Sequence, residues 1–253
     1  MVSALNQLSL LSDSGPDNGR NPWVVRESAR ARRLAVRVHR TGQVEVVVPP
    51  RTAPGTVQRF IESHRGWIEE RRAAALRSRP PEQPFPPDRI EFGVNGENWR
   101  LHLTGGAGRL RLATYDHLLI VTGDATAPGA LRRKLTDWLM DRAQAVLEPL
   151  LAQVAVGHGF RHSKVVIRRQ RTRWGSCSSR GVISLNVSLM FQPSAVVRYL
   201  LTHELSHTRH MDHSPRFWAC VEACCPDWRE RDRQLLQGWR RVPSWLFDPA
   251  EES

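Results

Sequence analysis

Residues 202–207 read Thr-His-Glu-Leu-Ser-His, and a further histidine, His213, follows six positions later. On an α-helix, positions four apart share a face and lie about 6 Å apart along the axis, so His203 and His207 can bind one metal ion. Glu204, one position round the helix, can reach a water on that ion. This spacing is the H-E-x-x-H pattern of zinc-dependent peptidases, so the stretch predicts a metal site.

The flanking residues favour a helix from Ser194 to about Met211, a run without internal proline or glycine. Proline and serine at 193 and 194 are typical of a helix start. Asp212 then begins a turn, and Ser214-Pro215 indicates the cap and first residue of another helix. His213 is therefore expected in a bend, from which it can swing toward the metal. An apolar stripe at helical spacing supports the first helix: Val196, Val197, Leu200 and Leu201.

Several side chains compete with His213 for the third ligand position. His210 shares a helix face with His203, but about 10 Å of axis separates them, so a straight helix cannot bring both onto one ion with His207. Glu222 on the next helix would suit peptidases that use a glutamate. Asp212 is expected to point elsewhere. Buried positions are expected for three cysteines that lack a metal-site spacing: Cys220, Cys224 and Cys225.

The expected chemistry follows from this ligand set. Three neutral imidazoles leave one position of a tetrahedral zinc ion open to water. Zinc lowers the pKa of that water toward about 7 and polarises a substrate carbonyl. Glu204 would take the proton of the water and pass it to the leaving amine. No oxyanion stabiliser is assigned: Tyr199 is more typical of a packing residue, and Arg209 and His210 are weaker candidates.

A longer pattern surrounds the histidines. Its parts, in order, are Arg173-Trp174-Gly175-Ser176-Cys177, Ile183-Ser184-Leu185-Asn186, Leu189, Pro193, Tyr199, His203-Glu204-Leu205-Ser206-His207, Asp212-His213-Ser214 and Phe217-Trp218. This order resembles the YgjP-like metallopeptidase family, over roughly residues 24–240. The resemblance implies a zincin-like catalytic domain with ligands at His203, His207 and His213 and a catalytic Glu204. Asp212 stands where the family usually has asparagine.

The Trp-Gly-Ser-Cys part lies at the end of an alternating run, 165–173, that predicts a strand, and 182–187 predicts a second strand returning beside it. In zincins a strand edge beside the metal helix holds the substrate backbone, so Trp174 or Cys177 could line the cleft. Packing of Trp174 and Gly175 under the metal helix is the favoured alternative. A nucleophilic Cys177 would leave the H-E-x-x-H pattern unexplained.

Composition bounds the class of protein. The chain has 253 residues, 40% of them hydrophobic, which is ordinary for a soluble protein. It lacks both the ~20-residue apolar run needed to cross a bilayer and the features of a signal peptide. Four cysteines, two of them adjacent, do not make a disulfide framework. We therefore expect a cytoplasmic protein without membrane contact.

The net charge is +12, and nearly all the cations are arginines. Clusters occur at 30–33, 168–173 and 229–233, and the second directly precedes the expected cleft. A solvated or acid-paired face explains each, and Glu230 and Asp232 favour that explanation for the third. Nucleic-acid contact by the second cluster is the alternative.

The expected fold class is α+β. A disordered tail (1–22) precedes a β-rich N-terminal region (23–126), and a zincin-like metallopeptidase domain (127–247) precedes a short tail (248–253). The N-terminal region should contain a β-hairpin (34–38 with 44–48), one helix (56–76), a proline-rich linker (79–87) and two further strand pairs (90–103 and 110–121). A long helix, 128–156, should then lead into the metal domain, with Pro149 able to kink it.

These patterns predict zinc-dependent hydrolysis of peptide bonds in a polypeptide substrate. Two other functions stay open. A metal-dependent nucleotide pyrophosphatase would use the arginines near Arg171, but no glycine-rich phosphate loop or magnesium-binding carboxylate cluster is visible. A nucleic-acid-associated protein with structural zinc would leave Glu204 without a role.

Overall fold

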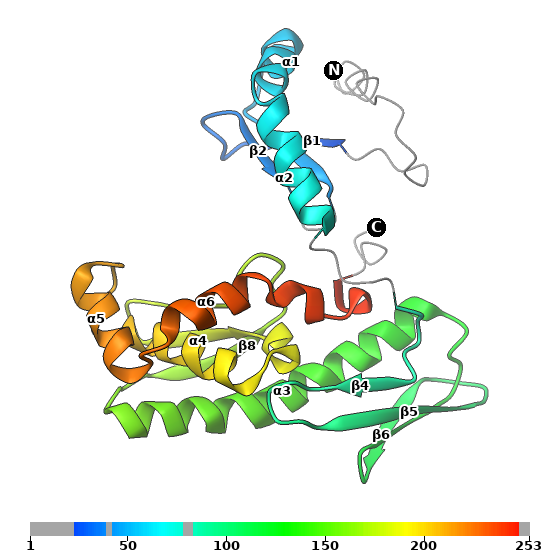
Figure 1. Ribbon diagram of the computed structural model, residues 1–253. Helices are drawn as coiled ribbons and strands as arrows, with labels where there is room; N and C mark the ends of the chain where they lie inside the picture. The colour runs from blue at the N-terminus through cyan, green and yellow to red at the C-terminus, as the bar shows by residue number, and fades with distance from the viewer. Residues whose placement is uncertain (1–22, 39–41, 78–82, 248–253) are drawn as a thin grey trace. The chain divides into compact units, whose positions relative to one another are not determined.

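The computed structural model describes residues 23–38, 42–77 and 83–247. The chain divides into two compact units, Met1–Arg79 and Pro80–Ser253 (Figure 1). This division falls well before the boundary expected at residue 126. The two expected tails, and residues 78–82 of the expected linker, lie outside the described residues; residues 83–87 form no helix or strand.

The first unit contains a three-stranded sheet in which β3 (Val44–Val48) lies between β1 (Trp23–Glu27) and β2 (Ala35–Val38). The antiparallel pairing of β2 with β3 confirms the predicted hairpin. Strand β1, which was not predicted from the sequence, runs parallel to β3. Val46 and Val48, two residues apart on β3, point to the same face of the sheet and form a small core with Val57 and Ile61 of the helix that follows.

The single helix predicted for 56–76 is wrong, because two helices occupy this region: α1 (Pro54–Ser63) and α2 (Arg65–Arg77). His64 leaves the helical conformation, with φ −111° and ψ 5°, and its backbone N–H bonds to the carbonyl of Ile61 at 3.1 Å. The carbonyl of Phe60, which an unbroken helix would pair with that N–H, instead lies 2.8 Å from Nδ1 of the His64 ring. The side chain thus competes with the backbone and breaks the helix.

The second unit begins with a four-stranded sheet in the order β4-β5-β7-β6, formed by β4 (Arg89–Glu91), β5 (Asn98–Gly105), β6 (Arg111–Tyr115) and β7 (Leu118–Thr122). The antiparallel pairs β4/β5 and β6/β7 confirm the two predicted strand pairs. A parallel pairing of β5 with β7, which the sequence did not indicate, joins them into one sheet.

The long helix α3 (Pro128–His158) confirms the prediction for 128–156. The helix continues through Pro149 and ends at Gly159, which adopts a left-handed conformation with φ 65°. Leucines and one alanine at four-residue intervals give it a continuous buried stripe: Leu131, Leu135, Leu139, Ala143, Leu147 and Leu151. Residues from both sides of the expected domain boundary belong to the same buried cluster as this stripe.

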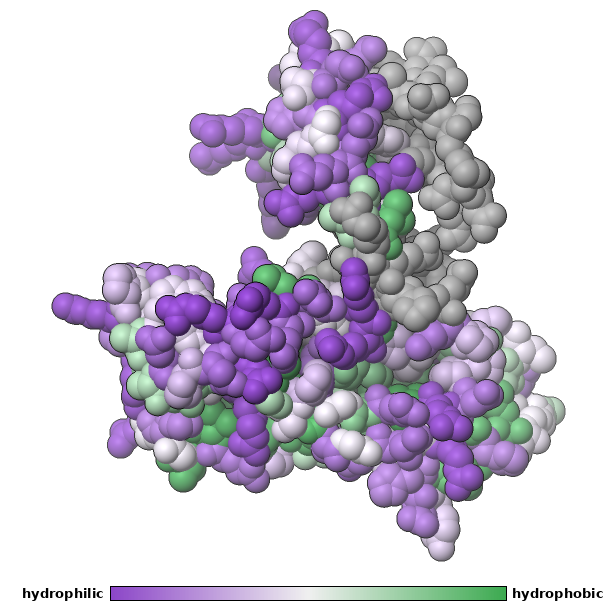
Figure 2. Space-filling view, in the orientation of Figure 1, coloured by the Kyte–Doolittle hydropathy of each residue, from purple (hydrophilic) through white to green (hydrophobic). Residues whose placement is uncertain are grey.

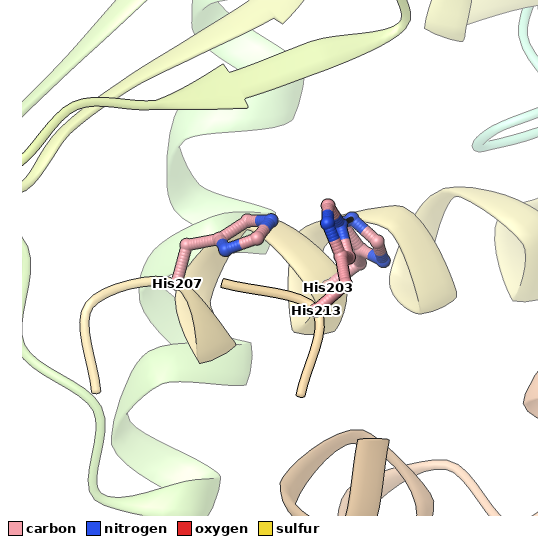
Figure 3. Close-up of side chains that lie close together, drawn as sticks. All are labelled: His203, His207 and His213. Carbon is pink, nitrogen blue, oxygen red and sulfur yellow. Dashed lines mark hydrogen bonds between the residues drawn. The ribbon is translucent and has the colours of Figure 1, made fainter. Parts of the chain in front are cut away.

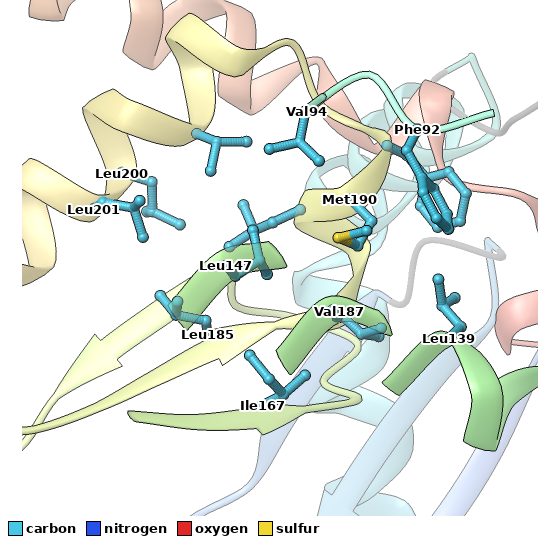
Figure 4. Close-up of a cluster of buried hydrophobic side chains, with 14 of the residues drawn as sticks. Phe92, Val94, Leu139, Leu147, Ile167, Leu185, Val187, Met190, Leu200 and Leu201 are labelled. Atoms are coloured by element: carbon cyan, nitrogen blue, oxygen red, sulfur yellow. The ribbon is translucent and has the colours of Figure 1, made fainter. Parts of the chain in front are cut away.

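Figure 4 shows part of this cluster. Phe92 and Val94, from the β4–β5 region, lie in one cluster with Leu139 and Leu147 of α3 and with residues of the later elements. The N–H of Val94 also donates to the carbonyl of Met190 at 3.3 Å. One core therefore spans the four-stranded sheet and the metal helix, which places that sheet in the second unit.

A second sheet of this unit has the order β8-β10-β9, formed by β8 (Lys164–Arg168), β9 (Gly175–Cys177) and β10 (Val182–Asn186). The predicted hairpin of 165–173 with 182–187 is wrong, because β8 ends at Arg168 and runs parallel to β10. The chain crosses to the far side of β10, where β9 pairs with it antiparallel as an edge strand.

Asn186 explains why the strand stops at Arg168. Its side-chain amide donates to the carbonyls of Gln170 and Arg173, both at 2.6 Å. Its backbone N–H donates to the carbonyl of Trp174 at 2.8 Å. These three bonds hold residues 170–174 as a loop, and the loop delivers Gly175 to the edge of the sheet.

The remaining elements are the 3₁₀ turn η3 (Val187–Phe191), the helices α4 (Ser194–Ser206), α5 (Pro215–Cys224) and α6 (Trp228–Leu236), and the turns η4 (Gly238–Arg241) and η5 (Ser244–Phe247). Helix α4 ends five residues before the expected Met211. The hydroxyl of Thr208 donates to the carbonyl of Leu205 at 2.7 Å, and the N–H of Thr208 bonds to the same carbonyl at 2.9 Å. This tight turn ends the helix.

Within the described residues, no helix combines the length and apolar character needed to span a membrane. The face of the second unit drawn in Figure 2 is largely hydrophilic, with hydrophobic residues in small scattered patches.

Candidate metal centre

The structure brings the three predicted histidines together (Figure 3). His203 lies in the last turn of α4, His207 caps its end, and His213 comes from the bend between α4 and α5. One nitrogen of each ring lies within 4.8 Å of those of the other two. The Nε2 atoms of His203 and His213 are 3.3 Å apart. Helix spacing thus aligns two of the rings, and the bend supplies the third.

The spacing of two of the rings fits a tetrahedral metal ion. Zinc–nitrogen bonds of about 2.0–2.1 Å place neighbouring ligand atoms about 3.3–3.4 Å apart. The separation between His203 and His213 matches that value. Nδ1 of His207 lies 3.1 Å from the carbonyl of His210, and donation to that oxygen leaves the lone pair on Nε2 for a metal.

The surroundings favour the neutral, metal-binding form of His203 and His207. Burial, followed by the charges of His207 and His213, lowers the pKa of His203 to about 3. Burial also lowers the pKa of His207, although its bond to the His210 carbonyl works in the opposite direction. Neutral imidazoles are the form that binds transition metals.

Phe217 packs against all three histidine rings. The sequence indicated it only as part of the Phe-Trp pair, without this contact. Its side chain is 0% exposed. Its ring centroid lies 4.9 Å from that of His203, 4.4 Å from that of His207 and 4.8 Å from that of His213. Trp218 lies 5.7 Å from the His213 ring and stacks on Trp228 at 4.2 Å. Helix α5 therefore braces all three imidazoles.

Glu204 is 4% exposed and lies against β9. Burial raises its pKa to about 8. A Cβ added to Gly175 would lie 2.6 Å from Oε1 of Glu204, closer than real Cβ contacts come, so any larger residue here would force the Glu204 side chain to shift. The neighbouring Trp174 stacks on Trp239 with ring centroids 3.9 Å apart. These contacts support the packing interpretation of Trp174 and Gly175.

The thiol of Cys177 is poorly suited to nucleophilic chemistry. Burial and, to a smaller extent, the charge of Glu204 raise its pKa to about 11. A thiol with such a pKa stays protonated near neutral pH, and only the thiolate is an effective nucleophile.

The alternative ligands lie elsewhere. Glu222 is exposed and pairs with Arg229 at 2.9 Å. A hydrogen bond with Ser214 lowers the pKa of Asp212. His210 contributes its carbonyl to His207. The cysteines of α5 and its end pack against the core and form no disulfide, but they are only half-buried, whereas buried positions were expected: Cys220, Cys224 and Cys225.

Tyr199 and Arg209, two candidates for the residue that stabilises the oxyanion, make other contacts. The buried hydroxyl of Tyr199 donates to Asp232 at 2.9 Å. Arg209 donates to the carbonyls of His158 and Gly159, at 3.0 and 2.8 Å, and lies over the ring of Phe160. Tyr199 is therefore a packing residue, and Arg209 caps the end of α3.

The arginine clusters differ in their surroundings. In the third cluster, Arg229, Arg231 and Arg233 pair with Glu222, Asp227 and Glu230, respectively, which confirms an acid-paired face. In the second cluster, Arg169 donates to the carbonyl of Leu246 at 3.4 Å. Nucleic-acid contact by the second cluster stays a prediction.

Comparisons with known proteins place this geometry in context. The family model described as "YgjP-like, metallopeptidase domain" matches residues 32–237. Among solved structures, the chain is similar to the metallopeptidase zymogen of Pyrococcus abyssi abylysin, with 25% sequence identity and a TM-score of 0.35, over 38% of this chain and 98% of that chain. No curated protein matches the chain.

Proposed function

The chain belongs to the YgjP-like metallopeptidase family, and on that premise we propose that it is a zinc-dependent enzyme that hydrolyses peptide bonds in polypeptides. The observation that carries this proposal is the convergence of three imidazole nitrogens within 4.8 Å of one another, with the buried Glu204 following His203 on the same helix. Zinc is the metal proposed because an all-imidazole set with an open fourth position is typical of catalytic zinc sites.

His203, His207 and His213 would hold the ion. When bound, zinc would supply a Lewis acid that polarises the substrate carbonyl and makes its water more acidic. The chain's own contribution is to fix the rings. Phe217 packs against all three, and the His210 carbonyl orients His207.

Glu204 would move the proton. As general base, its carboxylate would accept a proton from the attacking water, and as general acid it would pass that proton to the leaving amine nitrogen. A carboxyl group whose pKa burial raises to about 8 is suited to take up and return a proton near neutral pH. Contact with Gly175 would hold the carboxylate in place.

The substrate would bind as an extended chain along β9. This strand is at the edge of its sheet and begins at Gly175, which touches Glu204. A peptide that adds to a free strand edge forms backbone hydrogen bonds regardless of its sequence. A strand edge next to Glu204 therefore favours a polypeptide over a nucleotide as the substrate. A cytoplasmic location is also proposed, since the four cysteines are unpaired.

The substitution Glu204→Gln tests the mechanism. The variant keeps the side-chain volume and should retain zinc, while turnover of an unfolded polypeptide should fall by about 10²–10⁴-fold. Glu91→Gln is the matched control, because Glu91 is an exposed residue of β4 outside the cluster. Undiminished cleavage by the Glu204 variant would overturn the proposed mechanism.

Metal analysis tests the ligands separately. The purified protein should hold about one zinc per chain, and His213→Ala should lose most of it. His210→Ala should retain the metal, because His210 serves His207 through its backbone carbonyl. Full zinc retention by the His213 variant would point to Glu222 as the third ligand.

A further inference from the structure

A depression of about 300 Å³ lies beside the proposed metal centre. Its walls come from residues 161–163 before β8, from the turn 178–181 between β9 and β10, and from the end of α4. The last wall contains His207, Thr208 and Met211. Because His207 is one of the clustered imidazoles, a group bound in the depression lies next to the proposed metal centre.

The lining is basic and rich in hydroxyl groups. Arg161 and Arg180 are both exposed, and neither forms an ion pair with any residue in the described part of the chain. No carboxylate lines the depression, and Asp212, next to Met211, is engaged by Ser214. Hydroxyl and imidazole groups complete the lining: Ser163, Ser178, Ser179 and His162.

Hydrogen bonds hold the two arginine-bearing segments together. The Ser163 hydroxyl donates to the carbonyl of Arg180 at 2.8 Å, and the Ser163 N–H donates to the carbonyl of Gly181 at 2.9 Å. Within the turn, the N–H of Val182 donates to the hydroxyl of Ser178 at 3.1 Å. The turn that carries Arg180 is thus fixed against Ser163, two residues after Arg161, before any ligand binds, which lowers the entropic cost of binding.

The depression also continues the proposed path of the substrate. Strand β9 ends at Cys177, and the next residue, Ser178, belongs to the wall. A polypeptide paired with β9 therefore passes the turn 178–181 within one or two residues. Side chains of a strand alternate in direction, so one substrate side chain can point into the depression while the backbone stays on β9.

We propose that this depression is a specificity subsite that binds a glutamate or aspartate side chain of the polypeptide substrate, with Arg161 and Arg180 as the charged partners. Guanidinium groups bind carboxylates through paired, charge-assisted hydrogen bonds. The inference rests on the proposed peptidase function and adds to it a preference for acidic residues near the cleaved bond.

A peptide series tests the preference. One glutamate is moved through the positions around the cleaved bond, and each peptide is paired with its glutamine counterpart. At one position, glutamate should raise kcat/KM by about tenfold or more, mainly through a lower KM. Arg161→Gln and Arg180→Gln should each reduce this ratio, and Arg180→Glu should shift the preference toward lysine. Arg216→Gln, an exposed arginine of α5 outside the depression, is the matched control.

Binding provides a readout that does not need turnover. The Glu204→Gln variant should bind the favoured glutamate peptide more tightly than its glutamine counterpart, by fluorescence anisotropy, and Arg180→Gln in that background should remove the difference. If the enzyme cleaves peptides but neither readout shows a glutamate preference, the subsite is wrong and the peptidase function stands. If no peptide is cleaved but the arginine-dependent binding is present, the depression binds acidic side chains as proposed, but the peptidase function, and with it the role in cleavage specificity, falls. Hydrolysis of nucleoside triphosphates that requires both arginines would overturn the peptide subsite.

Discussion

The carboxylate of Glu204 lies against the backbone of Gly175, so that a Cβ at position 175 would come within 2.6 Å of Oε1 and 2.9 Å of Cγ. This contact joins the metal helix α4 to the edge strand β9. Gly175 is needed for its lack of a side chain, since no unusual φ is involved. The position of the proposed base therefore depends on a glycine that lies 29 residues earlier in the sequence.

Gly175→Ala should lower activity without removing the metal. The added methyl group would push the Glu204 carboxylate aside, and displacement of a catalytic group by about 1 Å can lower the rate by about 10²-fold. Zinc content and kcat are measured together. Gly157→Ala is the control, because nothing lies within 4 Å of the added methyl there. Wild-type kcat in the Gly175 variant would mean that the carboxylate position does not limit the reaction.

Tyr199→Phe should affect stability more than catalysis. The hydroxyl donates to Asp232, so its loss should lower the free energy of unfolding by about 1 kcal/mol and leave kcat within about twofold. Chemical denaturation and steady-state kinetics check the two parts. Tyr115→Phe, at a 75% exposed tyrosine, should change neither. A fall in kcat of about 10²-fold or more would instead identify Tyr199 as an oxyanion donor.

Asn186→Ala should destabilise the second unit. Asn186 is 0% exposed, and its removal leaves the carbonyls of Gln170 and Arg173 without their donor. We expect the free energy of unfolding to fall by about 2 kcal/mol or more. Asn98→Ala is the control, because Asn98 is exposed and makes one long bond of 3.3 Å to Glu91. Equal stabilities of the two variants would contradict this role of Asn186.

Glu97→Gln should remove a pH-dependent part of the stability. Burial alone would raise the pKa of Glu97, but hydrogen bonds from Arg142 and Trp99, the charge of Arg142 and a bond from Asn95 outweigh it and lower the pKa. A carboxyl group with a lowered folded-state pKa contributes stability above its unfolded pKa and loses it as the pH falls through the folded value.

The Glu97 variant should therefore be less stable than wild type at pH 7, by about 1–3 kcal/mol, and the difference should shrink as the pH falls below about 5. Denaturation curves at several pH values measure this. Glu91→Gln provides the comparison, since Glu91 is exposed and its ion pair with Arg89 is long, at 3.8 Å. A wild-type–variant difference that is constant from pH 7 to about pH 3 would be inconsistent with the lowered pKa.

The sequence alone predicted the histidine cluster because the information is local. His203 and His207 are four residues apart on a helix whose apolar stripe and proline-serine start are visible in one stretch. Ser214-Pro215 marked the start of the next helix, and that left His213 in a bend of only a few residues. Backbone geometry over so short a range has few alternatives.

Only the tertiary structure decided the surroundings of that site. The bonds from Asn186 place Gly175 on the far side of β10 and under Glu204, and the stripe on α3 places the four-stranded sheet in the same core as the metal helix. These relationships join residues that are far apart in sequence. Helical spacing and turn residues govern contacts within one or two turns of chain, whereas strand order and the contacts of a buried carboxylate depend on long-range hydrogen bonding and packing, which no local pattern specifies.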